Sequence, residues 1–167
     1  SEASGRAAQQ LALVATALCV FAAARRLADA RWARVAPLVL IGMALPFGLS
    51  RGLATDLFQL ALVTPALWLL HESAIRRAAI PIAGALALLG ASMLAKGPIA
   101  LLVVAAVWAA WAACSGRFAR VPLRGVAVGA LLFLAIGLPW YALLAVREPG
   151  AIGWMLEQLA SRTRSGG

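Results

Sequence analysis

Long apolar runs, separated by short polar loops, dominate this chain. Hydrophobic residues make up 63% of the 167 positions and charged residues 13%, and the mean hydropathy is +0.91. Soluble domains are about half apolar and about a quarter charged. The runs are long and do not alternate as the strands of a membrane barrel do, so they suit membrane-crossing helices. The sequence therefore predicts an all-α, polytopic transmembrane helical bundle.

About six membrane spans fit these runs. We expect them near residues 7–24, 35–49, 53–70, 78–95, 98–113 and 126–146. A short interfacial helix is expected over 152–160. Two spans contain Pro65 and Pro139, and we expect Pro139 to interrupt the last one. Because the chain begins with Ser1 and shows no signal peptide, we expect residues 1–167 to be a fragment of one transmembrane domain.

The placement of the arginines predicts how the spans are oriented. The formal net charge is +9, and nine of the fifteen Lys and Arg residues follow the first, third and fifth spans. The positive-inside rule assigns these loops to the cytoplasm, which places Arg51, Asp56, Lys96, Arg147 and Glu148 on the outer side. Because the cations are divided among short loops, the charge indicates membrane topology and no nucleic-acid partner.

One predicted outer turn holds the only lysine of the chain, Lys96. Gly97 suits the position just past a helix end, and Pro98 suits the first position of the next helix. Residues 94–99 therefore predict a tight helical hairpin that presents Lys96 at the membrane surface. A plainer interpretation is that Lys96 snorkels and offsets the dipole of the helix that it ends.

Asp56 falls in the first turn of an apolar span, where a carboxylate is costly unless it is paired or faces a wet cavity. Helix capping by Thr55 or Asp56 would explain this one position. Capping does not explain why separate spans bring Arg51, Lys96 and Arg147 to the same side. Lys and Arg suit a phosphate, and Asp suits a sugar hydroxyl, an amine or a cation. These residues predict a lipid-phosphate site, with apolar grooves between spans for a lipid tail.

Other polar and aromatic residues have structural interpretations. Trp140 and Tyr141 are interpreted as belt residues at the membrane interface, and His71 as an interface residue. Cys19 and Cys114 lie inside apolar segments and form neither a disulfide pattern nor a metal-ligand spacing. No metal site is predicted here, and a requirement for a divalent cation as cofactor is left open.

Three short motifs, each at a predicted span end, resemble a known family. They are Thr-Asp at 55–56, Lys-Gly-Pro at 96–98 and Pro-Trp-Tyr at 139–141, with Arg-Glu-Pro following at 147–149. Their order and spacing resemble the bacterial polyprenyl-phosphate-sugar-dependent membrane glycosyltransferases. This is the aminoarabinose transferase and protein mannosyltransferase-like group of the GT-C fold. The resemblance extends from about residue 10 to about residue 160.

The resemblance implies an enzyme of the bacterial cytoplasmic (inner) membrane with its active face outward. A sugar on a polyprenyl phosphate would pass to an acceptor oxygen of lipid A, protein or wall glycan. Asp56 matches the family aspartate beside the donor sugar, and Lys96 matches the family lysine that attracts the phosphate. By charge, Arg51 and Arg147 join this donor site, and Arg162 is the candidate for a family arginine downstream.

The main catalytic carboxylate of this family lies in the first outward loop, which we expect upstream of Ser1. No catalytic residue is therefore expected within residues 1–167. A C-terminal extracytoplasmic domain, present in many members, is also expected outside this stretch. The family histidine that follows the Pro-Trp-Tyr span has no counterpart here, where Glu157 and Gln158 stand instead.

Two other functions fit the same residues. A lipid-phosphate transporter or flippase segment would explain the cationic cluster and the proline-containing spans without any chemistry. A noncatalytic membrane scaffold would leave Asp56 and Lys96 replaceable without effect. An acidic residue in an outward loop upstream of Ser1 would distinguish transfer from transport.

Overall fold

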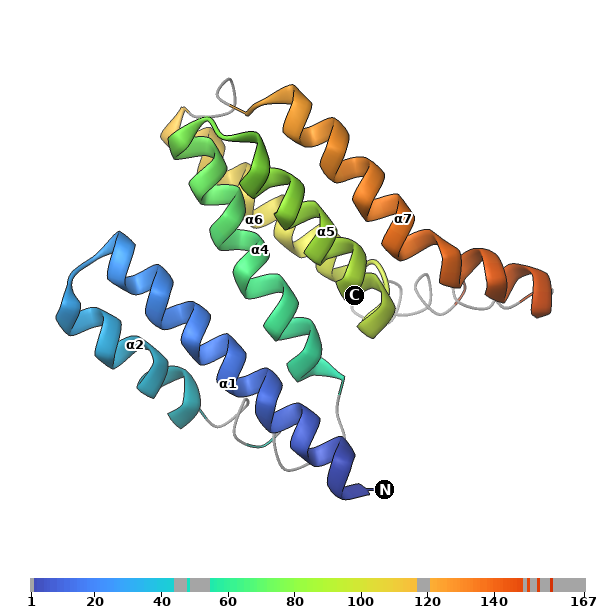
Figure 1. Cartoon of the computed structure of the whole chain (residues 1–167), viewed down its shortest axis with the longest axis horizontal. Coiled ribbons are helices and arrows are strands. Elements are labelled where there is room, and N and C mark those ends of the chain that lie inside the picture. Colours follow the sequence, from blue (N-terminus) through green and yellow to red (C-terminus); the bar gives the residue numbers. More distant parts are fainter. Residues whose placement is uncertain are drawn as a thin grey trace.

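Helices make up nearly all of the described chain. The computed structural model describes residues 2–43, 48, 55–116, 121–148, 150, 153 and 157. These ranges contain no strand, and their helices are α1 (Glu2–Leu27), α2 (Ala30–Gly42), α4 (Asp56–Arg76), α5 (Ala79–Lys96), α6 (Ile99–Ser115) and α7 (Leu123–Arg147) (Figure 1). Each helix overlaps one of the predicted spans, so the all-α helical class is confirmed.

Three of the described helices are long and apolar enough to cross a membrane, namely α4, α7 and residues Ser4–Leu27 of α1. Helices α5 and α6 are apolar but shorter, and α2 has only 13 residues. A helix of that length covers about 20 Å, less than the roughly 30 Å of a hydrocarbon core. For the shorter helices, membrane crossing stays a prediction. Most of the predicted helix at 152–160 lies outside the described residues, which include only Gly153 and Glu157 of it.

Prolines do not divide the long helices. Helix α4 continues through Pro65, and α7 runs for 25 residues with Pro139 inside it. The predicted interruption at Pro139 is therefore wrong. A proline removes one backbone hydrogen bond of its helix. In α7 the remaining hydrogen bonds and the packing against α5 keep the flanking turns helical.

The helices form a row in which α1 lies between α2 and α4, and α5 lies between α4 and α7 (Figure 1). Helix α6 packs against α4 and α5. The larger core cluster joins α4, α5 and α6 through Ala66, Leu70, Ile82, Ala85, Leu89 and Val104. A smaller cluster joins α1 to the start of α4 through Ala12, Leu13 and Leu57. Helix α4 therefore links both halves of the molecule.

The turn between α5 and α6 follows the predicted hairpin. Helix α5 ends at Lys96, and the Gly97 N–H donates to the Met93 carbonyl at 2.9 Å. Gly97 has a φ of +82°, which a residue with a Cβ rarely adopts. The sequence predicts Pro98 as the first residue of the next helix, whereas α6 begins one position later, at Ile99. This one-residue difference is within the usual ambiguity of helix ends.

Helix α7 approaches α5 closely because glycines line one of its faces. Gly125, Gly129 and Gly137 recur at multiples of four residues, which places them on the same side of the helix. A Cβ at Gly125 would lie 2.6 Å from the Ala79 carbonyl oxygen, and one at Gly129 would lie 3.0 Å from the Ala83 Cα. Small residues at this spacing allow membrane helices to reach backbone contact.

We expect Gly125→Ala to destabilise the α5–α7 pair by about 1–3 kcal/mol, the usual range for overpacking. The added methyl group would overlap the Ala79 backbone, which cannot move aside as a flexible side chain can. Gly42→Ala is the matched control, because a Cβ at Gly42 meets no atom within 4 Å. Thermal unfolding of both variants in one detergent measures the difference. Equal melting temperatures would contradict the close approach of α5 and α7.

Candidate functional site

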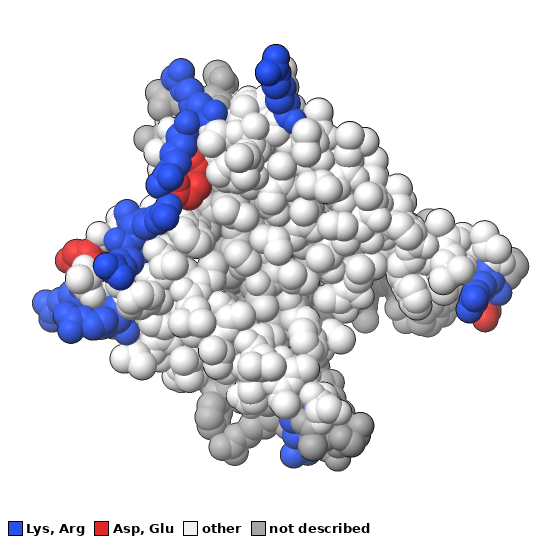
Figure 2. Space-filling model, viewed as in Figure 1, with Lys and Arg blue, Asp and Glu red and all other residues white. Residues whose placement is uncertain are grey.

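The helices begin and end at two opposite sides of the molecule, and these two sides differ in charge. The arginine-rich end comprises the described arginines at the end of α1, the start of α2, the end of α4 and the start of α7, namely Arg25, Arg26, Arg31, Arg34, Arg76, Arg77 and Arg124. In Figure 2 most of the visible basic side chains follow this edge of the molecule. The other end holds the starts of α1, α4 and α6 and the ends of α5 and α7. Asp56 lies there, at the same helix ends as Arg6, Lys96 and Arg147.

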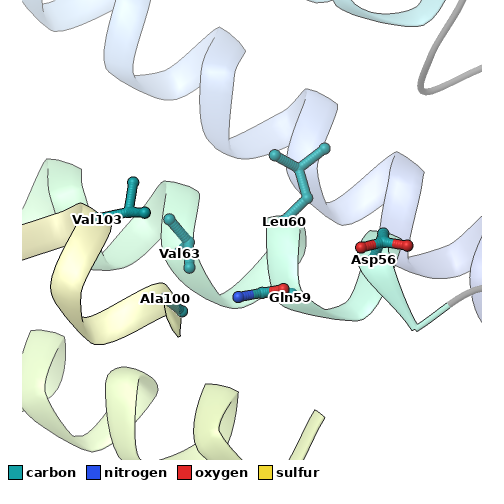
Figure 3. Close-up of a pocket in the computed structure, with 6 residues that line it drawn as sticks. All are labelled: Asp56, Gln59, Leu60, Val63, Ala100 and Val103. Carbon is teal, nitrogen blue, oxygen red and sulfur yellow. The ribbon is translucent and has the colours of Figure 1, made fainter. Parts of the chain in front are cut away.

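Asp56 lines a cavity of about 210 Å³ between α4 and α6. The cavity is bounded by Asp56, Gln59, Leu60, Val63, Ala100 and Val103 (Figure 3). Asp56 is half-buried and is the first residue of α4, where a negative charge also offsets the helix dipole. Thr55 precedes it and makes no side-chain capping hydrogen bond. Capping by Thr55 therefore does not account for this helix start, and the Asp56 carboxylate faces a space that a ligand can enter.

Gln59 belongs to the same cavity and was not singled out in the sequence. It follows Asp56 by three residues, which is nearly one helical turn, so both side chains lie on one face of α4. In Figure 3 the Gln59 side chain extends from α4 toward the first turn of α6. The spacing from Asp56 was the available signal. This spacing was a weak signal, because a span that is apolar on every side does not reveal which face meets a cavity.

The Lys96 turn borders the Asp56 cavity. Ala100, in the first turn of α6, forms part of the cavity wall and follows Lys96 by four residues. Four steps between Cα atoms cover at most about 15 Å. The fold therefore brings the Thr-Asp and Lys-Gly-Pro segments, which lie far apart in the sequence, to the same region of the molecule.

The Pro-Trp-Tyr segment of α7 contacts the other side of the Lys96 turn. The Tyr141 hydroxyl donates a hydrogen bond to the Met93 carbonyl at 3.0 Å, and a Cβ at Gly97 would lie 3.7 Å from the Tyr141 Oη. Tyr141 thus connects α7 to the end of α5, beyond the belt position expected for it. Trp140 is 53% exposed, and its interpretation as a belt residue stays a prediction.

The three arginines expected at the donor site have different outcomes. Arg147 ends α7 and is exposed, and it is not among the residues that line the Asp56 cavity. Arg51 and Arg162 lie outside the described residues. Of the candidate cations, the structure therefore relates only Lys96 to the cavity, through the turn that ends in its wall.

A second, larger cavity of about 530 Å³ lies between α5 and α7. Its lining side chains are apolar apart from the indole nitrogen of one tryptophan, and they are Leu94, Ile136, Pro139, Trp140 and Leu143. Leu94 stands two residues before Lys96, so this apolar cavity and the Asp56 cavity lie near the two ends of one short turn.

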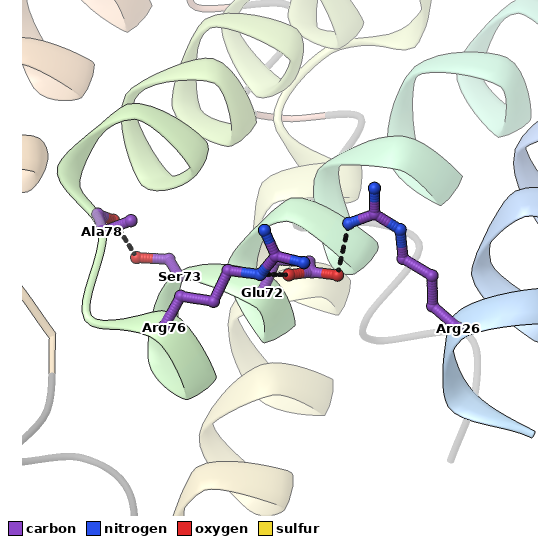
Figure 4. A network of polar contacts seen from close by, with 5 residues as sticks. All are labelled: Arg26, Glu72, Ser73, Arg76 and Ala78. Atoms are coloured by element: carbon purple, nitrogen blue, oxygen red, sulfur yellow. Dashed lines mark hydrogen bonds and ion pairs between the residues drawn. The ribbon is translucent and has the colours of Figure 1, made fainter.

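At the arginine-rich end, an ion pair connects α1 to α4, and a second ion pair lies within α4. The Glu72 carboxylate pairs with Arg26 of α1 at 3.1 Å and with Arg76 of its own helix (Figure 4). The Arg26 guanidinium carbon also lies 5.5 Å from the centre of the Trp68 ring. The Glu72 side chain is only 13% exposed, as expected for a carboxylate with two cationic partners. These charges hold helices together, and none of them is among the residues that line the Asp56 cavity.

The turn from α4 to α5 at this same end has its own support. Arg77 adopts a left-handed backbone with a φ of +53°, and the Ser73 hydroxyl donates to the Ala78 carbonyl at 2.8 Å (Figure 4).

Nearby, the His71 and Trp111 rings pack with their centres 4.6 Å apart. His71 therefore packs against α6, and its location at the membrane interface stays a prediction. Within the described part of the chain, no group of three His, Cys, Asp or Glu side chains is arranged to hold a metal ion.

Comparison with known families relates this geometry to a function. The family model described as dolichyl-phosphate-mannose-protein mannosyltransferase matches residues 1–142. The match includes the Thr-Asp, Lys-Gly-Pro and Pro-Trp-Tyr segments and stops before Arg147 and Arg162. No curated protein and no solved structure matches the chain. The family match covers most of the sequence, and the chain belongs to the dolichyl-phosphate-mannose-protein mannosyltransferase family, whose members are membrane glycosyltransferases of GT-C type.

Proposed function

We propose that this chain forms the donor-binding part of an enzyme that transfers a sugar from a polyprenyl phosphate to an acceptor. The observation that carries this proposal is the cavity of Asp56, whose opposite wall begins four residues after Lys96. A carboxylate and a cation in this relation suit the two polar parts of such a donor, which are its sugar and its phosphate.

In the proposed reaction an acceptor oxygen attacks the anomeric carbon of the sugar. The bond between that carbon and the phosphate oxygen breaks, and polyprenyl phosphate leaves with its electron pair. Asp56 accepts hydrogen bonds from the sugar hydroxyls, while Lys96 attracts the phosphate. Arg51, Arg147 and Arg162 are further candidates for the phosphate.

The apolar cavity between α5 and α7 suits the first isoprene units of the lipid tail, because apolar side chains form nearly all of its lining. It lies two residues from Lys96, and a lipid tail is attached directly to the donor phosphate. The sugar, the phosphate and the tail would then follow one path along the Lys96 turn.

The acceptor's proton must be removed by a base aligned with the attacking oxygen. Asp56 has a donor-side role in this proposal, and Glu148, which caps the C-terminal end of α7, is not among the residues that line the Asp56 cavity. We therefore propose that the catalytic carboxylate precedes Ser1 in the complete protein. Lipid A, protein and wall glycan remain candidate acceptors, and a divalent cation is a candidate cofactor.

We further propose a location in the bacterial cytoplasmic membrane, with several helices crossing it and the Asp56 cavity on the outer side. The arginine-rich end supports this orientation, because short cytoplasmic loops of membrane proteins carry an excess of Lys and Arg. The Asp56 cavity lies at the opposite helix ends.

Membrane vesicles of the two orientations test this function. We expect right-side-out vesicles containing the complete protein to use an externally added short-chain polyprenyl-phosphate-mannose. Labelled mannose would join a membrane acceptor, and short-chain polyprenyl phosphate would be released, whereas inverted vesicles would do neither. Vesicles that lack the protein are the control. Passage of the intact donor into the vesicle lumen would show a transporter, and transfer by inverted vesicles alone would reverse the orientation.

A further inference from the structure

Gln59 is the second polar side chain of the Asp56 cavity. Of the described side chains that line this cavity, Asp56 and Gln59 are the two with polar groups, and Leu60, Val63 and Val103 supply most of the rest. Figure 3 places Gln59 between Asp56 and the start of α6, with its amide directed away from α4. The polar groups are therefore confined to one wall, and the facing wall is apolar.

The Gln59 amide is available to a ligand. Across the part of the chain that the structure describes, its side chain makes no hydrogen bond, while its backbone N–H donates to the Thr55 carbonyl at 3.1 Å within the helical ladder. Polar side chains in membrane helices usually bond across to a neighbouring helix. Gln59 faces α6 across a cavity and makes no such bond, so packing between α4 and α6 does not explain its presence.

The chemistry of the two polar groups is complementary. An ionised carboxylate only accepts hydrogen bonds, whereas a carboxamide both donates and accepts. Neighbouring hydroxyls of a sugar ring also donate and accept, so one hydroxyl can donate to Asp56 while the next bonds to Gln59. The apolar wall suits the C–H face of the same ring.

The size of the cavity limits what it can hold. Its volume of about 210 Å³ lies below the roughly 300–1,000 Å³ of pockets for drug-sized ligands. A single sugar ring is small enough for such a space, and a complete lipid-linked sugar is not. The cavity is therefore suited to distinguish one ring from another.

We propose that Gln59 is a specificity-determining residue that hydrogen-bonds a donor-sugar hydroxyl next to the one held by Asp56. This inference rests on the proposed function, because it takes the occupant of the cavity to be the donor sugar. It adds a residue that reads the configuration of the sugar, whereas Lys96 interacts with the phosphate that all such donors share.

Deoxy-sugar donors test this role. The probes are polyprenyl-phosphate-mannose and its four analogues that lack the hydroxyl at C2, C3, C4 or C6. We expect one analogue to lower the kcat/KM of the complete wild-type protein by about threefold to tenfold, the usual effect of one neutral hydrogen bond. Gln59→Met, which keeps the length of the side chain, should lower kcat/KM for polyprenyl-phosphate-mannose by the same factor. In this variant that one analogue and polyprenyl-phosphate-mannose should then have equal kcat/KM values.

Gln10→Met is the matched control, because Gln10 is an exposed glutamine of α1 outside the cavity, and we expect it to respond to all four analogues as the wild type does. If Gln59→Met responded to all four analogues as the wild type does, the role of Gln59 would be overturned. If Asp56→Asn still weakened use of the donor, the proposed function would survive that result. If the wild-type protein did not use polyprenyl-phosphate-mannose, both proposals would fail for a mannosyl donor.

Discussion

In the complete enzyme, Asp56→Asn is expected to lower kcat/KM for sugar transfer by roughly tenfold to a hundredfold while the protein stays folded. The amide keeps the shape of the side chain and removes its charge. A hydrogen bond to a charged group contributes about 1.5–3 kcal/mol, which corresponds to this loss. The stability should fall by less than about 1 kcal/mol, the contribution of an acidic residue to a helix dipole. Transfer rates per folded molecule, together with melting temperatures, measure the two effects.

Asp29→Asn provides the matched control for this substitution. Asp29 caps α2 at the arginine-rich end, where its Oδ1 accepts from the N–H groups of Arg31 and Trp32 at 2.9 and 3.0 Å. Asparagine caps helices about as well as aspartate, so transfer and stability should both be retained. If Asp56→Asn instead lowered the melting temperature and left the rate per folded molecule unchanged, Asp56 would be a structural residue.

Lys96→Ala is expected to weaken binding of a polyprenyl-phosphate donor by roughly tenfold to a hundredfold, because one charge-assisted contact to phosphate is lost. Lys96→Arg should retain most of the affinity, since it keeps the positive charge at the end of α5. The effect should diminish at high salt, where exposed charges are screened. Titration of the complete protein with polyprenyl-phosphate-mannose at two salt concentrations measures these differences.

Arg124→Ala is the control for Lys96→Ala, because it removes a cation from the arginine-rich end and should leave donor affinity unchanged. An equal loss in Lys96→Ala and Lys96→Arg would indicate that the shape of the turn matters and the charge does not. Unchanged binding in both variants would return Lys96 to the plainer interpretation of a residue that snorkels and offsets its helix dipole.

The connection of Tyr141 to Met93 gives these substitutions a structural context. The hydrogen bond at 3.0 Å joins α7 to the last turn of α5, just before Lys96. The glycines of α7 bring the two helices together along the rest of their length. The Lys96 turn is thus held from the α7 side while its other end leads into the wall of the Asp56 cavity.

The sequence by itself determined which segments are helical, although the predicted bounds of the second span, 35–49, differ from those of α2, Ala30–Gly42. Apolar runs of membrane length specify helices because backbone groups in lipid must bond within their own segment. Gly97 and Pro98 located the turn, since one tolerates a positive φ and the other cannot continue a hydrogen-bonded helix. The arginine pattern separated the two ends of the bundle. The family resemblance rested on the same span ends, and the family match confirms it.

Only the tertiary structure decided which faces of the helices meet. Gln59 lines a cavity, Gly125 touches α5 and Tyr141 bonds to Met93, although each belongs to a span that is apolar nearly all round. In a soluble helix an apolar stripe identifies the inward face, but membrane helices also present apolar residues to lipid, so this signal is lost. The choice of partners then depends on close fit between side chains far apart in the sequence, which no local pattern of residues encodes.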